Sequence, residues 1–168
     1  MNWFRKSKQK TESIPELTTS MLYDESTFYK QFLQDAIHAK KEIIIESPYI
    51  TKRRVSMMKS TFEKLLEKGI HVVIITRSPQ EHDVIMAEQA EIGIQYFESI
   101  GIQVLLVKGG HHRKLAMIDR EVLWEGSLNI LSQSNSREFM RRIESRQLTK
   151  ELFQFLKFNK ITEYNRKA

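Results

Sequence analysis

Amphipathic stretches alternate with short apolar runs along the first two thirds of the chain. In three stretches the apolar residues recur at helical spacing, and in the third we expect Ile85, Ile92 and Phe97 to face the core. Three shorter, β-branched runs between and after them are typical of buried strands. Such alternation predicts an α/β fold with a mixed, mostly parallel sheet flanked by helices on both faces. The predicted helices cover residues 26–40, 55–66 and about 80–99, and the predicted strands cover 42–46, 71–76 and 102–107.

The pattern changes in the last third of the chain. Two short apolar runs at 114–118 and 121–125 are separated only by Asp119 and Arg120, which predicts two strands joined by a tight hairpin turn. A further strand at 137–143 and a last helix follow. For that helix we expect Thr149 as the N-terminal cap and an inner face made of Leu152, Phe155 and Leu156.

Length and composition indicate one domain with enough chain for a core. The chain has 168 residues, of which 40% are hydrophobic, and a domain of this size buries about 70% of its unfolded surface. Residues 1–20 are polar and basic and show no periodicity, so we predict a flexible N-terminal tail followed by a single domain at 21–168. The absence of cysteine excludes disulfides and thiolate metal sites.

Neither a membrane span nor a secretory signal is expected from the sequence. No apolar run approaches the roughly 18 residues that a spanning helix needs. The basic start of the chain lacks the apolar stretch that follows such a start in a secretory signal. We therefore expect a cytoplasmic protein with no stable membrane association.

Positive charge is concentrated in the last part of the chain. The first 104 residues carry 14 Lys and Arg and 14 Asp and Glu, whereas the last 64 residues carry 13 and 7. The whole formal net charge of +6 therefore lies in the last part. Such an excess suits a polyanionic substrate such as nucleic acid, and a basic surface without a partner is the alternative.

A set of phosphate-binding residue types occurs once in that basic part. His112 and Lys114 are two apart and project to the same side of an extended segment. A neutral imidazole can attack phosphorus, and the lysine ammonium can hold the phosphate oxygens. Ser127 and Asn129 follow Gly126 and offer a hydroxyl and an amide. Taken singly, a His-x-Lys pair can arise by chance, a histidine near a strand is often structural, and Gly-Ser-x-Asn is a common turn.

Taken together, these residues resemble the HKD signature of the phospholipase D superfamily. The similarity extends over about residues 22–158 and includes two upstream strand segments. It implies a phospholipase D-like α/β/α sandwich and says little about the substrate. The segments that carry it are His112-x-Lys114-x4-Asp119-x6-Gly126-Ser127-x-Asn129, Glu46–Thr51 and Lys68–Arg77.

The resemblance also implies a role for each residue of the motif. His112 would be the nucleophile or, in a partner subunit, the general acid, and Lys114 and Asn129 would bind phosphate. Ser127 would support the pocket, and Asp119 would order the hairpin and its neighbours. Two further residues are candidates: Glu138, at the place of the family's later glutamate, could hold the Nδ1–H of the histidine, and Tyr49 could contact substrate.

A single motif leads us to expect two chains in one site. In-line displacement needs an attacking group on one side of phosphorus and an acid on the other, and two histidines can supply both. Since the His112 and Lys114 pair occurs once, an isologous homodimer would complete the site. We expect no metal ion and no other cofactor.

The leading hypothesis is a metal-independent endonuclease that acts on DNA or RNA, with DNA favoured, through a phosphohistidine intermediate. One alternative is a phospholipid-hydrolysing phospholipase D, which would need an apolar rim near the pocket. Another, of a different class, is a non-cleaving nucleic-acid-binding module beside a helicase or another repair or defence protein.

Overall fold

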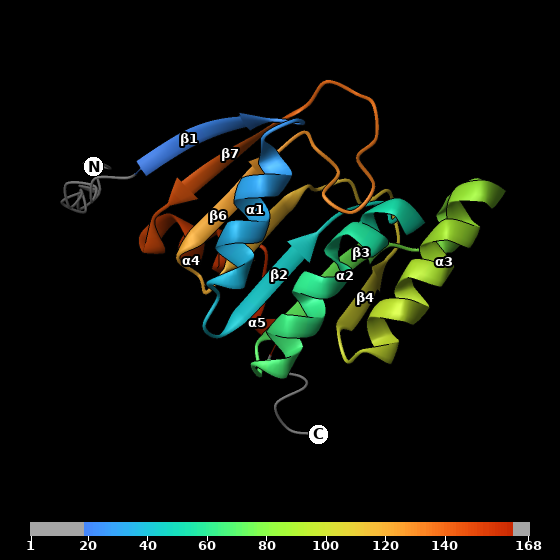
Figure 1. The fold of residues 1–168 in the computed structure, drawn as a ribbon, viewed down its shortest axis with the longest axis horizontal. Helices are drawn as coiled ribbons and strands as arrows, with labels where there is room; N and C mark the ends of the chain where they lie inside the picture. The colour runs from blue at the N-terminus through green and yellow to red at the C-terminus, as the bar shows by residue number, and fades with distance from the viewer. Residues whose placement is uncertain (1–18, 163–168) are drawn as a thin grey trace, which may run out of the picture.

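The computed structural model describes residues 19–162 and places a seven-stranded sheet between two layers of helices (Figure 1). The strands are β1 (Thr19–Asp24), β2 (Glu42–Glu46), β3 (His71–Arg77), β4 (Gln103–Val107), β5 (Leu115–Ile118), β6 (Val122–Gly126) and β7 (Phe139–Glu144). The helices are α1 (Phe28–Ile37), α2 (Lys52–Glu67), α3 (Val84–Ser99), α4 (Arg146–Phe155) and α5 (Asn159–Thr162), with a short 3₁₀ helix at Pro79–Glu81.

The sheet is mixed, but the expectation that it is mostly parallel is wrong. The strand order is β1-β7-β6-β5-β2-β3-β4. Only β2–β3 and β3–β4 pair in parallel, and the other four neighbouring pairs are antiparallel. Parallel pairing needs a crossover such as α2 or α3. The strands after β4 are joined without a helix between them, so they pair antiparallel to one another.

Helices cover both faces of the sheet, as the sequence predicts (Figure 1). On one face α1, α2 and α3 pack through a large core that includes Phe28, Phe62, Phe97 and Trp124, all fully buried. On the other face the α4 region packs through a smaller cluster that includes Phe153. Residues of β2, β3, β5, β6 and β7 also belong to the smaller cluster, so the sheet contributes to a core on each side.

The predicted strands and helices are confirmed with small shifts at their ends, and three details are wrong. The sequence does not predict β1, which includes residues 19 and 20 of the expected tail; residues 1–18 lie outside the described part. The side chains of Ile85 and Phe155 point to solvent, 72% and 80% exposed, and Ile92 is also exposed. Ser145 rather than Thr149 caps α4, accepting a hydrogen bond from the N–H of Leu148.

Asp119 stabilises the predicted hairpin between β5 and β6. Asp119 and Arg120 adopt positive φ angles of 54° and 58°, a conformation that two-residue hairpins need and that glycine or asparagine usually supplies. The Asp119 carboxylate accepts hydrogen bonds from the backbone N–H groups of residues 40, 41 and 42, at 2.8, 2.8 and 3.0 Å. These bonds hold the turn against the start of β2 despite its unfavourable backbone angles.

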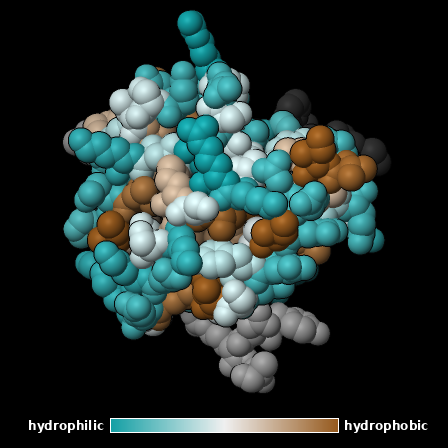
Figure 2. All heavy atoms as spheres, turned by 45° about the vertical axis from the view of Figure 1, so that its right-hand side comes forward, coloured by the Kyte–Doolittle hydropathy of each residue, from teal (hydrophilic) through white to brown (hydrophobic). Residues whose placement is uncertain are grey.

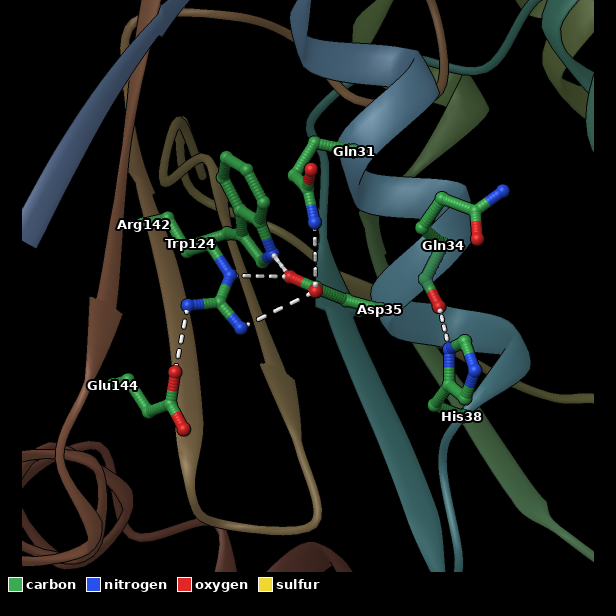
Figure 3. A network of polar contacts seen from close by, with 7 residues as sticks. All are labelled: Gln31, Gln34, Asp35, His38, Trp124, Arg142 and Glu144. Atoms are coloured by element: carbon green, nitrogen blue, oxygen red, sulfur yellow. Dashed lines mark hydrogen bonds and ion pairs between the residues drawn. The ribbon is translucent and has the colours of Figure 1, made fainter. Parts of the chain in front are cut away.

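A polar network joins α1 to the antiparallel half of the sheet (Figure 3). The Asp35 carboxylate accepts hydrogen bonds from Nε of Arg142 at 2.7 Å and from the indole N–H of Trp124 at 3.0 Å. Gln31 donates to the same carboxylate from one turn earlier in α1. The side chains of Asp35 and Arg142 are only 10% and 14% exposed. The network therefore fixes α1 on β6 and β7 through a nearly buried ion pair.

None of the helices within residues 19–162 combines the length and hydrophobicity needed to cross a membrane. On the face shown in Figure 2, hydrophobic residues form separate groups between hydrophilic ones.

Candidate functional site

The β5–β6 hairpin brings the two halves of the sequence motif together at its open end. β5 begins at Leu115, so His112 and Lys114 lie in an extended segment just before the strand rather than within it. The N–H of Gly126 donates to the carbonyl oxygen of Lys114 at 3.3 Å. The Gly-Ser-x-Asn turn therefore starts directly beside the lysine, twelve residues later in the chain.

The Lys114 ammonium lies against the imidazole of His112. Its Nζ is 2.8 Å from Nδ1 and 3.4 Å from Nε2, and it donates to the His112 carbonyl oxygen at 3.0 Å. The ammonium can only donate, so the nearer ring nitrogen, Nδ1, accepts. His112 is exposed and Lys114 is half-buried. Desolvation lowers the pKa of Lys114, and the charge of Glu138 opposes that shift.

The Tyr49 ring contacts two histidine rings, one of them that of His112. The Tyr49 ring lies edge-on to the His112 ring with centroids 6.3 Å apart, and it contacts the His82 ring at 4.9 Å. Tyr49 follows the carboxyl end of β2, where the chain leaves the sheet at Pro48. The side chain of Tyr49 is therefore placed at the same edge as the histidine.

Ser127 fixes the end of β6 to the start of β7. Its N–H donates to the carbonyl oxygen of Phe139 at 3.0 Å, and its hydroxyl accepts from the N–H of Phe139 at 3.2 Å. Gly126 allows this close approach, because a Cβ there would lie 2.2 Å from the Phe139 carbonyl oxygen. The serine hydroxyl is thus used to build the turn.

Asn129 carries an amide oxygen that is buried and has no hydrogen-bond partner within the described residues. Its backbone oxygen accepts from Ser132 and Gln133, closing a turn. The following loop is attached to the end of β2 and the start of α2: Leu131 N–H donates to the Ser47 hydroxyl at 3.1 Å, and Arg54 Nε donates to the Gln133 carbonyl at 2.6 Å.

A buried carboxylate that the sequence analysis did not single out lies behind the histidine. Glu46, at the end of β2, is fully buried; one of its oxygens accepts from Arg113 at 2.8 Å and lies 3.9 Å from Nε2 of His111. Burial raises the pKa of Glu46, partly offset by Arg113, and burial lowers the pKa of His111. The hydrogen bond from Arg113 therefore ties the residue after His112 to the end of β2, while Nε2 of His111, on the other side of the exposed imidazole, is buried and has no hydrogen-bond partner within the described residues.

The segment before the histidines is attached through Glu81. Its carboxylate accepts from the N–H groups of Gly109 and Gly110 at 2.7 and 3.3 Å and from Arg77 at 2.8 Å. The hydrogen bond from Gly109, followed by those from Arg77 and Gly110, lowers the pKa of Glu81 to about 2. The carboxylate therefore stays ionised and holds the loop over a wide pH range.

A cavity of about 520 Å³ opens at this edge of the sheet. Its lining is strongly cationic and contains one carboxylate. The lining residues are His112, Arg113, Lys114, Leu115, Glu125, Gly126, Phe139 and Arg141.

Comparison with known families agrees with this arrangement. The profile of the family described as cardiolipin synthase, PLD-like domain, matches residues 32–158. The chain belongs to this phospholipase D-like family. No curated protein matches the sequence.

Solved structures share the phospholipase D-like fold. Nuc from Salmonella typhimurium, described as a phospholipase D family member, is 15% identical with a TM-score of 0.69, and the match covers 82% of this chain and 91% of that one. NucT from Helicobacter pylori is 20% identical with a TM-score of 0.66, covering 87% and 96%. Phosphatidylserine synthase from Haemophilus influenzae is 18% identical with a TM-score of 0.63, covering 84% of this chain and 38% of that one.

In this phospholipase D-like chain, not all of the predicted site residues lie close together. Tyr49, His112 and Lys114 lie together, and Ser127 and Asn129 follow the Gly126 that lines the cavity. Asp119 lies at the opposite end of the hairpin, held to the backbone of residues 40–42. This position does not support a catalytic role for Asp119. The hydrogen bonds to residues 40–42 instead support the expected role of Asp119 in ordering the hairpin.

Glu138 does not make the contact expected for it. Nδ1 of His112 lies 2.8 Å from Lys114 Nζ, and across residues 19–162 no hydrogen bond joins the Glu138 carboxylate to the imidazole. The charge of Glu138 acts on Lys114, and its N–H donates to Glu25. Sequence reasoning did not single out Glu46, although a carboxylate at the end of an apolar strand is a signal that the sequence contains.

Proposed function

We propose that this protein is a phosphodiesterase that cleaves nucleic acid, as an endonuclease, through a covalent phosphohistidine and without a metal ion. The observation that carries the proposal is the Lys114 ammonium held within 3.4 Å of both ring nitrogens of His112 at a cationic cavity. A phosphate at the ring of His112 would have a positive charge beside its oxygens. Among residues 19–162, no group of three or more His, Asp or Glu side chains is arranged to hold a metal ion.

The reaction would run in two steps. The Lys114 ammonium turns from Nδ1 of His112 to the phosphate oxygens, the ring nitrogen that it frees donates its electron pair to phosphorus, and the bond from phosphorus to the leaving oxygen breaks. The protonated His112 of the partner subunit gives its proton to that oxygen. In the second step the same partner imidazole takes a proton from water, and the resulting hydroxide attacks phosphorus and releases His112. Lys114 and Asn129 hold the non-bridging oxygens and stabilise the charge that develops on them.

Two subunits are part of the proposal because the motif occurs once in the chain. An isologous two-fold contact would place two cavities face to face, so that each histidine supplies one role. Activity per subunit should then fall when dilution separates the subunits. A monomer that keeps full activity at high dilution would refute the shared site.

The decisive experiment compares wild type with His112→Ala. His71→Ala is the matched control, because His71 is an exposed histidine at the start of β3 and does not line the cavity. Single- and double-stranded DNA, RNA and phosphatidylcholine vesicles are assayed in excess chelator. We expect cleavage of nucleic acid by wild type and the control, and a loss of about 10³-fold or more with His112→Ala.

Two other results would overturn the proposal. Cleavage of lipid without cleavage of nucleic acid would show a phospholipid hydrolase. Binding of nucleic acid without cleavage by wild type would show an accessory module, such as one that serves a helicase.

A further inference from the structure

We infer that Phe139 and Arg141 form a subsite for a single-stranded nucleic acid, in which one unpaired base stacks on Phe139 and a neighbouring phosphate binds Arg141. This inference rests on the proposed function, from which it takes nucleic acid as the substrate class. It adds two residues that select an unpaired strand.

Phe139 and Arg141 project from the same face of β7 into the cavity of the candidate site. They are two residues apart, so their side chains lie on one face of the strand, and both line the cavity with His112 and Lys114. Glu125 of β6 lies opposite Arg141 in the sheet register. The next residue, Arg142, points to the other face and is taken up by the ion pair with Asp35.

Both side chains are free to bind a ligand. Phe139 is 53% exposed, whereas Phe28, Phe32, Phe62 and Phe97 are fully buried. Arg141 is exposed and, in the part of the chain that the structure describes, forms no side-chain hydrogen bond or ion pair. An exposed aromatic ring beside an unpaired guanidinium is the combination that stacks a base and holds the adjoining phosphate.

The lining favours an unpaired strand over a duplex or a lipid. A base in a duplex is already stacked on both faces, whereas an unpaired base has a face available for an aromatic side chain. Acyl chains would need a continuous apolar surface, but Leu115 and Phe139 are the only large apolar residues among the lining of this cavity. Four of the eight lining residues are His, Lys or Arg.

The test measures binding in full-length protein that carries His112→Ala, so that bound strands are not cleaved. Two labelled oligonucleotides of equal length are compared, oligodeoxythymidine and a strand whose central nucleotides are abasic. Phe139→Ala and Arg141→Ala are introduced separately. Phe155→Ala, at an exposed ring of α4, is the matched control for Phe139, and Arg146→Ala, which removes an arginine that pairs with Glu121, controls for the loss of one surface positive charge.

We expect Phe139→Ala to weaken binding of oligodeoxythymidine about fivefold or more and to leave the abasic strand almost unchanged. Arg141→Ala should weaken both strands and reduce the slope of log affinity against log salt by about 0.7, the value for one phosphate of a single strand. Glu125→Gln should tighten both, since a carboxylate in the cavity repels phosphate. The two control variants should bind as the parent does.

Three outcomes would overturn the subsite. In the first, Phe139→Ala binds both strands as the parent does. In the second, the variant loses binding together with a change in sedimenting mass, which would make Phe139 a subunit contact. In the third, cardiolipin vesicles bind in a Phe139-dependent way and the oligonucleotides do not. If the wild-type protein does not cleave nucleic acid but the expected binding pattern is found, the proposed reaction is refuted and the subsite is still supported. The subsite and the reaction are therefore tested separately.

Discussion

Gly126→Ala would test whether the close approach of β6 and β7 holds the candidate site together. An added Cβ would lie 2.2 Å from the carbonyl oxygen of Phe139 and 2.9 Å from the Cα of Met140, whereas ordinary contacts begin at 3.4 Å. Both obstacles are backbone atoms, so a side-chain rotation cannot relieve the clash. β7 would have to move away by more than an ångström.

The expected loss of stability follows from the hydrogen bonds that this movement of β7 would break. The reciprocal hydrogen bonds between Ser127 and Phe139, at 3.0 and 3.2 Å, would be lost, at about 1 kcal/mol each. Strain from overpacking adds about 1–3 kcal/mol. We therefore expect Gly126→Ala to lower the free energy of unfolding by about 3–5 kcal/mol and to reduce activity at the cavity that Gly126 lines.

Gly93→Ala is the matched comparison. There the added Cβ meets side-chain methyl groups, Ile50 Cγ2 at 2.5 Å and Val55 Cγ2 at 3.2 Å. Ile50 is fully buried, so repacking these side chains costs about 1–3 kcal/mol. Alanine favours the helix by about 1 kcal/mol, so the net loss should be at most about 2 kcal/mol. Urea denaturation of both variants gives the two free energies. Equal destabilisation, or a Gly126→Ala protein as stable as wild type, would refute the distinction between backbone and side-chain obstacles.

Three further predictions concern carboxylates away from the reacting atoms. Asp35→Ala should lower the free energy of unfolding by about 3–5 kcal/mol, because it leaves Arg142 and Trp124 without their buried partner. The double variant that combines Asp35→Leu with Arg142→Met should be less destabilised in the same urea assay. Equal losses in the two variants would contradict the argument. Glu46 has a pKa raised above its ordinary value of 4.5, so the folded state keeps the proton to higher pH and stability falls as pH rises from about 4.5 through the folded pKa. The stability of Glu46→Gln relative to wild type should therefore increase between about pH 4 and pH 8 in thermal melts. If the difference in stability between the two proteins does not change with pH, burial does not destabilise the ionised form of Glu46. Asp119→Ala should destabilise the protein by about 2–3 kcal/mol because three backbone N–H groups lose their acceptor, while the rate per folded molecule stays the same; a specific loss of rate would return Asp119 to the catalytic set.

Local patterns in the sequence predict most of the elements and the position of the motif. Two apolar runs around Asp119 and Arg120 predict the β5–β6 hairpin, and the structure has it with the positive φ angles that such a turn needs. The sequence also predicts His112 and Lys114 side by side, and their contact at 2.8 Å agrees.

Long-range pairing cannot be predicted in the same way. β1 is an edge strand with little buried surface, and it pairs with β7 more than a hundred residues later. The antiparallel insertion of β5 beside β2 also joins segments that are far apart in the chain. The position of Glu46 at the end of an apolar strand is visible in the sequence, but its burial is not, because it depends on Arg113, 67 residues later, returning to meet the carboxylate. Ile85 matches a helical period but lies in the first turn of α3, where its side chain is 72% exposed.

The hairpin also bears on the order in which the molecule acquires its structure. Lys114 and Gly126 are separated by only twelve residues, so they can meet through a short loop, whereas β1 and β7 close a very long one. Closing the shorter loop loses less chain entropy, and contacts of low sequence separation form faster. Substitutions in β5 and β6 should therefore slow refolding, and substitutions in β1 should mainly speed unfolding. The chemical groups would then be assembled before the outermost strand docks.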